Sequence, residues 1–307
     1  MGAKVVSLFC GCGGLDMGFV KAGYDIVWAN DFDKYAVQTY NANFDTKAIC
    51  ADINTIDYEM LPDHDVLIGG FPCQPFSMMG EKRGFEDNRG KLFMRFIDII
   101  KSKKKKHAQP KIVVLENVRN LMRHDNGNTY SVIKKQLEKC GYNVNCEILN
   151  SANYGVPQTR QRTFIVALLD KSSTYSYPKK IRLNKTLQDL LENDVDEKYY
   201  LSERIKKTIL SPGSGGYKSR FETDLQIARP LCATMGKMHR AGQDNYVTQN
   251  GRLRRLTPRE CARLQGFDDD FIIPVSDAQA YKQFGNAVTV NVAYEIAMSL
   301  LPLLHGD

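Results

Sequence analysis

The chain has 307 residues, 43% of them apolar, which suits one large soluble domain with or without a smaller partner. It contains no run of 18 apolar residues and no signal-peptide layout, so we expect no membrane span and a cytoplasmic location. Eight cysteines include no Cys-x-x-Cys pair, so we expect reduced thiols, with neither disulfides nor a metal site.

The formal net charge of +7 is compatible with a polyanionic partner without proving one. A lysine-rich run at 101–106 follows a helical pattern and is typical of a solvated helix end. A second basic segment runs through a polar loop into a helix start, where phosphate contacts are plausible. Its arginines are Arg252, Arg254, Arg255, Arg259 and Arg263.

The first half of the chain alternates strand and helix patterns. Strands are expected at 4–9, 25–29, 48–51, 65–69, 112–115, 144–149 and 163–169. Helices are expected at about 14–22, 33–43, 90–102 and 129–140. This alternation predicts an α/β fold with a doubly wound, mostly parallel sheet.

The pattern changes after about residue 170. We expect a linker at 172–178 and then a second, smaller, loop-rich domain at 176–277. Within that domain Thr257, Pro258 and Glu260 predict a helix start with a capping box. The division is therefore 1–175, 176–277 and a C-terminal segment, 278–307, whose helix from Val288 to Leu304 returns to the first domain.

A glycine-rich turn follows the first expected strand. The dinucleotide-binding pattern would need a third glycine where Asp16 stands, which argues against a nicotinamide dehydrogenase. Asp31, at the end of the second strand, suits ribose hydroxyls, and Asp52, after the third, suits an adenine amino group. Each acid alone is more often a cap or turn residue. Together they favour an adenosine-containing ligand without phosphates.

The segment around Cys73 follows the apolar run 66–68. Gly69 and Gly70 end that strand, and prolines stiffen the turn that carries the thiol. A thiol at the carboxyl edge of a sheet is a candidate nucleophile, although a small buried cysteine that only packs is the alternative.

Three further segments carry polar side chains at strand or helix ends. If the third to fifth strands lie side by side, Glu116 faces the same cleft as Cys73 and can be held protonated; otherwise it is a surface residue. Arg160 and Arg162 alternate along an extended segment and should share a face, unless they only pair at a strand edge. Asn286 lies in a turn expected to start and cap the final helix.

These five segments, in this order, resemble the cytosine-5 DNA methyltransferases, especially the bacterial modification enzymes. The matching motifs are Phe-x-Gly-x-Gly-Gly, Pro-Cys-Gln, Glu-Asn-Val, Gln-x-Arg-x-Arg and Gly-Asn-Ala-Val, and they are specific in combination. Segments 88–93 and 255–264 also look like family segments. The resemblance covers the chain apart from about 170–250.

The resemblance implies a Rossmann-like methyltransferase that acts on cytosine in a short double-stranded target. Cys73 would attack ring carbon 6, Glu116 would donate a proton to ring nitrogen 3, and Arg160 and Arg162 would lie near the base. The base must be flipped out of the duplex. S-adenosylmethionine would be the methyl donor and S-adenosylhomocysteine the product.

The resemblance also assigns binding residues. Those expected at the cofactor are Phe9, Gly11, Cys12, Gly13, Gly14, Asp31, Phe32, Asp52, Ile53, Pro72, Leu92, Asn286 and Val288. Those expected at DNA are Gln74, Ser77, Arg89, Arg220, Thr234, Lys237, Arg240, Arg255 and Arg259, with Met235 and His239 as further candidate readers. The loop 77–89 is expected to close over the flipped DNA.

Two relatives of the same scaffold are the alternatives. The transfer-RNA branch carries a Cys-Phe-Thr signature, but this chain has Cys232-Ala233-Thr234. A DNA-binding relative without catalysis would not need the intact set of Cys73 and Glu116. We expect a monomer in the bacterial cytoplasm or nucleoid. A restriction endonuclease for the same site is a candidate companion, although the sequence does not reveal whether one exists.

Overall fold

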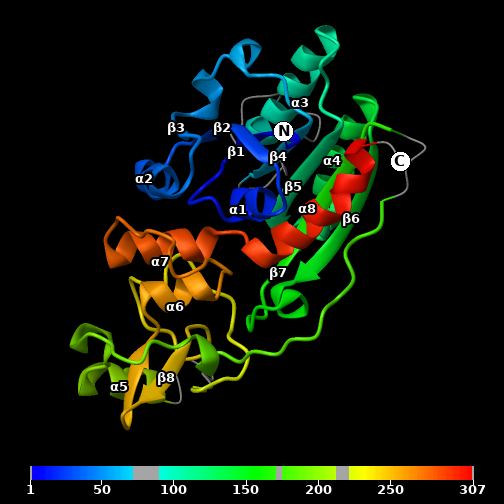
Figure 1. The fold of residues 1–307 in the computed structure, drawn as a ribbon. Helices are drawn as coiled ribbons and strands as arrows, with labels where there is room; N and C mark the ends of the chain where they lie inside the picture. The colour runs from blue at the N-terminus through cyan, green and yellow to red at the C-terminus, as the bar shows by residue number, and fades with distance from the viewer. Residues whose placement is uncertain (1, 72–89, 171–174, 212–220, 306–307) are drawn as a thin grey trace.

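The computed structural model describes residues 2–71, 90–170, 175–211 and 221–305. Within these ranges the larger part is a seven-stranded sheet with helices on both faces (Figure 1). Its strands are β1 (Lys4–Leu8), β2 (Asp25–Asp31), β3 (Ile49–Cys50), β4 (Val66–Gly70), β5 (Ile112–Val118), β6 (Asn143–Asn150) and β7 (Gln161–Leu168). The predicted α/β class is confirmed.

The order across the sheet is β3-β2-β1-β4-β5-β7-β6. All neighbouring pairs from β3 to β5 are parallel, whereas β7 runs antiparallel to both β5 and β6. The short connection 151–160 between β6 and β7 explains this reversal, because a parallel crossover needs a dozen or more residues.

One expectation about neighbouring strands is wrong. β3 lies at the sheet edge, separated from β4 by β2 and β1, so the third to fifth strands are not side by side. The strand that carries Glu116 is nevertheless next to the strand that precedes Cys73. β4 and β5 are neighbours, and Gly70 of β4 lies opposite Glu116 of β5. The wrong part reflects the doubly wound order, in which the chain returns to the middle of the sheet after β3.

The helices lie at α1 (Gly14–Lys21), α2 (Lys34–Asn43), α3 (Gly90–Lys105), α4 (Asn128–Lys139), α5 (Glu203–Leu210), α6 (Pro258–Arg263), α7 (Asp277–Asn286) and α8 (Val290–His305). Short 3₁₀ turns lie at 53–55, 58–60, 119–122, 124–127, 151–154, 188–190 and 197–199. The four helices predicted in the first half are confirmed within a few residues.

Successive strand residues divide between two cores. On β1, Val5 belongs to the core with α1, α2 and α8, while Val6 belongs to the core with α3 and α4. On β4, Ile68 and Leu67 divide in the same way. Because side chains alternate along a strand, a sheet buried on both faces needs the continuous apolar runs seen in the sequence.

The first and last helices of the chain pack closely. A side chain at Gly18 of α1 would meet Cβ of Ala293 in α8 at 2.4 Å. A side chain at Gly14 would meet the Val288 carbonyl oxygen at 2.2 Å. The C-terminal helix α8 thus packs directly against α1, at the other end of the chain.

The smaller part of the molecule lies below the sheet in Figure 1. It contains α5, α6 and a hairpin of β8 (Tyr246–Gln249) and β9 (Arg252–Arg255). Asn250 and Gly251 turn the hairpin with φ of 51° and 71°, the backbone geometry that Asn-Gly favours. The predicted capping box of α6 is confirmed: Thr257 accepts from the Glu260 amide, and Glu260 accepts from the Thr257 amide.

The C-terminal region differs from the prediction. Asn286 is the last residue of α7, so it does not cap the final helix, which starts at Val290. The helix α7 was not expected, because residues 277–286 were assigned to a loop and to the turn before the final helix. Tyr281 and Phe284 of α7 pack into an apolar cluster shared with α6, which we call the small-domain cluster.

The connection between the two parts begins on the sheet side. Tyr175 and Tyr177 pack against the core that contains α8, and the Ile181 amide donates to the Asn153 carbonyl. The divisions at 175 and 277 remain predictions.

The stretch Asp277–Leu304 is apolar and long enough, by length and composition alone, to cross a membrane. Half of its most apolar window is buried inside the protein, and the stretch is broken into α7 and α8. Packing of α8 against α1 accounts for its composition as a core helix.

Candidate active site

A cavity of about 400 Å³ opens at the carboxyl ends of β1, β2, β4 and β5. We call it the edge cavity. It is lined by Ser7, Leu8, Phe9, Cys10, Gly11, Cys12, Gly14, Leu15, Asp16, Asp31, Phe32, Asp33, Ala36, Gly70, Phe71, Glu116, Asn117, Val118, Arg162, Lys282, Gln283, Asn286, Ala287 and Val288. Open α/β sheets bind their ligands at this edge.

The glycine-rich turn forms one wall of the edge cavity. Gly11 and Gly13 have φ of 57° and 93°, a backbone region that favours glycine. A side chain at Gly13 would also meet the Phe44 ring at 2.3 Å. Phe9 itself has φ of 57°, so the chain bends sharply as it leaves β1.

Asp31 holds this turn in place. Its carboxylate accepts from the Gly11 amide at 2.9 Å and from the Asp33 amide at 2.8 Å. Burial raises the pKa of Asp31 above its ordinary value, although these hydrogen bonds oppose the rise. The neighbouring Phe32 is 70% exposed and lines the cavity, which leaves an aromatic face free for a ligand.

Glu116 lies on the opposite side of the edge cavity, at the end of β5. It is 8% exposed, and burial raises its pKa while Arg162 and then Arg160 lower it. Its Oε1 lies 3.1 Å from Arg162 Nε, yet it has no hydrogen bond because the N–H is not directed at it. Gly70 leaves room for the carboxyl group, since a Cβ there would meet Oε2 at 3.1 Å.

Arg160 and Arg162 have different surroundings. Arg160 is 1% exposed, and it donates to the carbonyls of Leu231, Gly285 and Ala287 at 2.9–3.0 Å. Burial lowers the pKa of Arg160 to about 9. Arg160 is absent from the cavity lining and ties the segments before and after α7 to the sheet, whereas Arg162 lines the cavity.

The edge cavity brings together eight of the residues predicted at the cofactor: Phe9, Gly11, Cys12, Gly14, Asp31, Phe32, Asn286 and Val288. It does not include Gly13, Asp52, Ile53 or Leu92. Asp52 instead caps a 3₁₀ turn by accepting a hydrogen bond from the Asn54 amide. This is the alternative given above, in which a single acid after a strand is a cap or turn residue. Ile53 and Leu92 pack in the core with α3.

Several predicted residues lie outside the described ranges. They are Pro72, Cys73, Gln74, Ser77, Arg89 and Arg220, together with the rest of the loop 77–89.

Sequence reasoning missed a buried network beneath the glycine-rich turn. Asp16 is fully buried and accepts from Ser7 Oγ at 3.0 Å and from Tyr40 Oη at 2.9 Å. Burial raises the pKa of Asp16 to about 6. The only signal in the sequence was the absence of the third glycine at this position. Lys282 and Gln283 of α7 were also missed, because α7 itself was not expected.

Most arginines of the basic segment at 252–263 already have hydrogen-bond or ion-pair partners within the protein. Arg254 is fully buried and pairs with Glu260, so the expectation that Arg254 contacts phosphate is wrong. Arg252 and Arg263 pair with Glu197 and Asp269, and Arg259 donates to the carbonyls of Asp268 and Phe271. Alternation along β9 turns Arg254 inward, which the polar surroundings of the sequence concealed.

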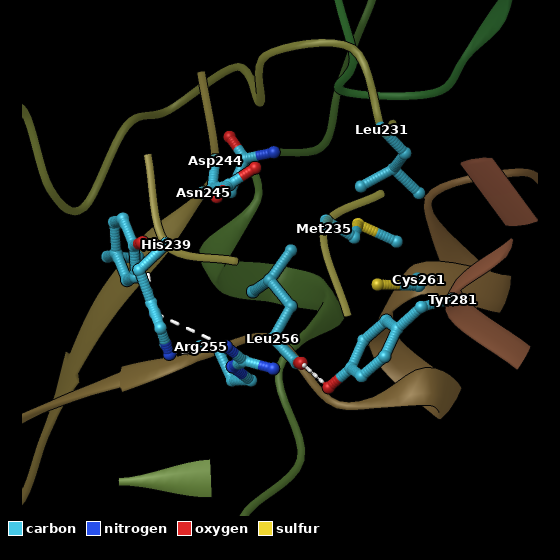
Figure 2. A pocket seen from close by; sticks show the side chains of 10 residues that line it. Leu231, Met235, His239, Asp244, Asn245, Arg255, Leu256, Cys261 and Tyr281 are labelled. Atoms are coloured by element: carbon cyan, nitrogen blue, oxygen red, sulfur yellow. Dashed lines mark hydrogen bonds between the residues drawn. The ribbon is translucent and has the colours of Figure 1, made fainter. Parts of the chain in front are cut away.

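A second, smaller pocket lies around Arg255 in the smaller part of the molecule (Figure 2). Arg255 donates to His239 Nε2 at 2.6 Å, and burial followed by the Arg255 charge lowers the pKa of His239. The volume of about 20 Å³ accommodates no more than a water molecule. Tyr281 closes the pocket by donating to the Leu256 carbonyl at 2.6 Å.

The other predicted DNA contacts have mixed surroundings. Thr234 and Lys237 are exposed, whereas Arg240 pairs with Asp244 at 2.8 Å. Whether any of them contacts DNA remains a prediction. Across the described ranges there is no group of three or more side chains suited to a metal ion, and the cysteines there are free thiols.

A family model described as C-5 cytosine-specific DNA methylase matches residues 3–301. The chain is 40% identical to the type II methyltransferase M.NlaX of Neisseria lactamica, over 96% of this chain and 95% of that protein. It is 37% identical to the type II methyltransferase M.HhaI of Haemophilus parahaemolyticus, over 97% and 95%. Its fold is similar to that of the S. pombe Dnmt2 methyltransferase, with a TM-score of 0.81 and 23% identity over 98% and 99% of the two chains.

Proposed function

Because this chain belongs to the family of C-5 cytosine-specific DNA methylases, we propose that it transfers a methyl group from S-adenosylmethionine to carbon 5 of cytosine in double-stranded DNA. The observation that carries the proposal is the joint presence, at one sheet edge, of an adenosine-suited cavity and a buried glutamic acid with a raised pKa.

The edge cavity fits such a donor in size and in charge. Its volume is within the range of small-molecule sites. Its titratable side chains are mainly acidic: Asp16, Asp31, Asp33 and Glu116 against Arg162 and Lys282. When bound, S-adenosylmethionine supplies an electrophilic methyl group on a positively charged sulfur, and an acidic cavity favours that charge. Asp31, Phe32 and the Gly11 backbone are the groups that would hold its nucleoside part.

We assign the nucleophile to Cys73. Cys73 follows the last residue of β4, Gly70, by three positions, and three residues span about 11 Å at most. Its thiolate would form a bond with ring carbon 6 and push ring electrons toward nitrogen 3. Carbon 5 then becomes an enamine carbon that can accept the methyl group.

Glu116 would supply the proton that nitrogen 3 takes up. Burial raises the pKa of Glu116, which favours the neutral acid over the carboxylate. Arg162, next to Glu116, would stabilise the carboxylate that remains after transfer. The cycle ends when water accepts the proton of carbon 5 and the bond between sulfur and carbon 6 breaks, with its electron pair returning to the Cys73 thiolate. Nitrogen 3 then returns its proton to Glu116.

Arg160 has a supporting role in this proposal. Its three hydrogen bonds to carbonyls hold the backbone at Leu231, Gly285 and Ala287. Ala287 lines the edge cavity, so Arg160 would shape the site through the backbone without contacting the reacting atoms.

The smaller part of the molecule would recognise the DNA sequence, with Thr234 and Lys237 as its exposed candidates. The named relatives near 40% identity are type II methyltransferases, which supports DNA over RNA as substrate and a role beside a restriction endonuclease. We propose further that the enzyme acts in the cytoplasm as a monomer.

Methylation-sensitive sequencing of DNA from cells that express the chain tests this function. We expect 5-methylcytosine at one short sequence in cells with the wild-type chain and none in cells with a Cys73→Gly variant. Folded, expressed protein that leaves every cytosine unmethylated would refute the proposal, as would methylation by the Cys73→Gly variant.

A further inference from the structure

Gln283 is a polar residue of α7 that the proposed mechanism does not use. It is 5% exposed and lines the edge cavity. Its Nε2 donates to the Tyr35 carbonyl at 2.8 Å, at the start of α2. Its Oε1 has no hydrogen-bond partner among the described residues.

The orientation of this side-chain amide follows from its surroundings. A carbonyl oxygen can only accept, so the group facing Tyr35 O must be the NH₂ group of Gln283. The opposite rotation would place two acceptor oxygens together. The Oε1 is therefore the atom left without a partner, in a side chain that borders the cavity.

A buried acceptor without a donor is unfavourable, and proteins tolerate few of them. In the edge cavity there are two, Gln283 Oε1 and Glu116 Oε1. Glu116 has a role on the cytosine, whereas Gln283 has none. A ligand that carries N–H or O–H donors would satisfy it.

We propose that Gln283 binds the methyl donor, with Oε1 accepting a hydrogen bond from an N–H or O–H group of S-adenosylmethionine. The inference rests on the proposed function. Its consequence extends beyond the cavity, because Tyr281 and Phe284 of the same helix pack in the small-domain cluster. The donor thus contacts the helix that connects the cavity to the smaller part of the molecule.

Neighbouring contacts show how a purely structural role can be separated from binding. Asn43 of α2 also links α2 to the C-terminal region: its amide donates to the Ile272 carbonyl and its oxygen accepts from the Ile272 amide, at 2.8 and 2.7 Å. Asn43 does not line the edge cavity. Asn43→Ala therefore weakens a contact between α2 and the segment that precedes α7, without touching the ligand site.

The test measures the affinity of the purified full chain for S-adenosylmethionine by titration calorimetry. Gln283→Met keeps the side-chain length and removes the acceptor, and we expect binding about 10-fold weaker. Asn43→Ala should bind within about 2-fold of wild type. Gln283→Glu keeps an acceptor oxygen but loses the donor to Tyr35, and it should bind more tightly than Gln283→Met.

Each outcome decides the proposal. Wild-type affinity in Gln283→Met would overturn the contact. An equal loss in Asn43→Ala would overturn it too, because it would show that the loss comes from weaker packing of α2 against the C-terminal region. Thermal unfolding of each variant confirms that the protein titrated is folded. A folded wild-type chain that binds no S-adenosylmethionine would instead refute the proposed function.

Discussion

Buried acidic side chains have different hydrogen-bond partners in the two parts of this molecule. In the small domain, Glu260 accepts through both oxygens from Arg254, and further from the amides of Thr257 and Glu192. In the edge cavity, Glu116 has an arginine nearby but leaves Oε1 without a hydrogen bond, and the side-chain partners of Asp16 are the hydroxyls of Ser7 and Tyr40.

This difference separates scaffold from site. The buried pair of Arg254 and Glu260 holds α6 against β9, and because its hydrogen-bonding capacity is used within the protein, it has no group left to bind a ligand. Buried carboxyl groups without full partners have raised pKa values and remain available for chemistry or binding. The comparison predicts that breaking the pair of Arg254 and Glu260 changes stability, while changing Glu116 changes activity.

The largest expected effect is on catalysis by Glu116. Glu116→Gln removes the proton donor while keeping the shape, so methyl transfer should fall about 1,000-fold with little loss of stability. Transfer of labelled methyl groups to DNA measures this. Glu147→Gln is the matched control, because Glu147 is exposed on β6 and shares the Phe164 register position with Glu116. Activity that survives in Glu116→Gln would contradict the assignment.

In the small domain the expected effect is on folding. Glu260→Gln leaves the Arg254 guanidinium buried without a counter-charge, which should cost about 3–5 kcal/mol of unfolding free energy. Urea unfolding provides the measurement. Breaking the exposed pair with Arg252 through Glu197→Gln should cost less than about 1 kcal/mol. Similar losses in both variants would refute the distinction between buried and exposed pairs.

The smallest effect concerns Asp16 and pH. Its folded-state pKa is raised from 3.8 to about 6, so folding favours the protonated acid. The stability that this provides is present below about pH 4 and is lost as pH rises toward 6, by about 3 kcal/mol. The neutral Asp16→Asn variant should lack this loss, so its stability relative to wild type should rise over that range. Parallel curves of unfolding free energy against pH for the two proteins would show that Asp16 does not carry the effect.

Much of the large sheet could be predicted, because its central strands β1, β4 and β5 contain short apolar runs followed by glycine or polar residues. The antiparallel β7 was not anticipated, since its direction depends on the length of a connection and on no residue of its own. The hairpin at Asn250-Gly251 was missed although that dipeptide favours such a turn. The reason is that the surrounding strands are short and largely polar.

The candidate site was predictable where a motif marks it and less so elsewhere. Glu116 and Asp31 follow strands and were found by position. Gln283 and Asp16 depend on which side chains lack partners, and only tertiary contacts decide that. Arg254 shows the converse, because a basic residue in a polar segment proved to be fully buried beside Glu260.

The most direct test of the central claim uses duplex DNA in which the cytosines are 5-fluorocytosine. After methyl transfer, carbon 5 carries fluorine in place of the proton that must leave, so the bond to sulfur cannot break. With S-adenosylmethionine present, we predict a denaturation-resistant complex whose mass places the adduct on the peptide that contains Cys73. No complex with wild-type protein that methylates ordinary DNA, or an adduct on another residue, would contradict the account.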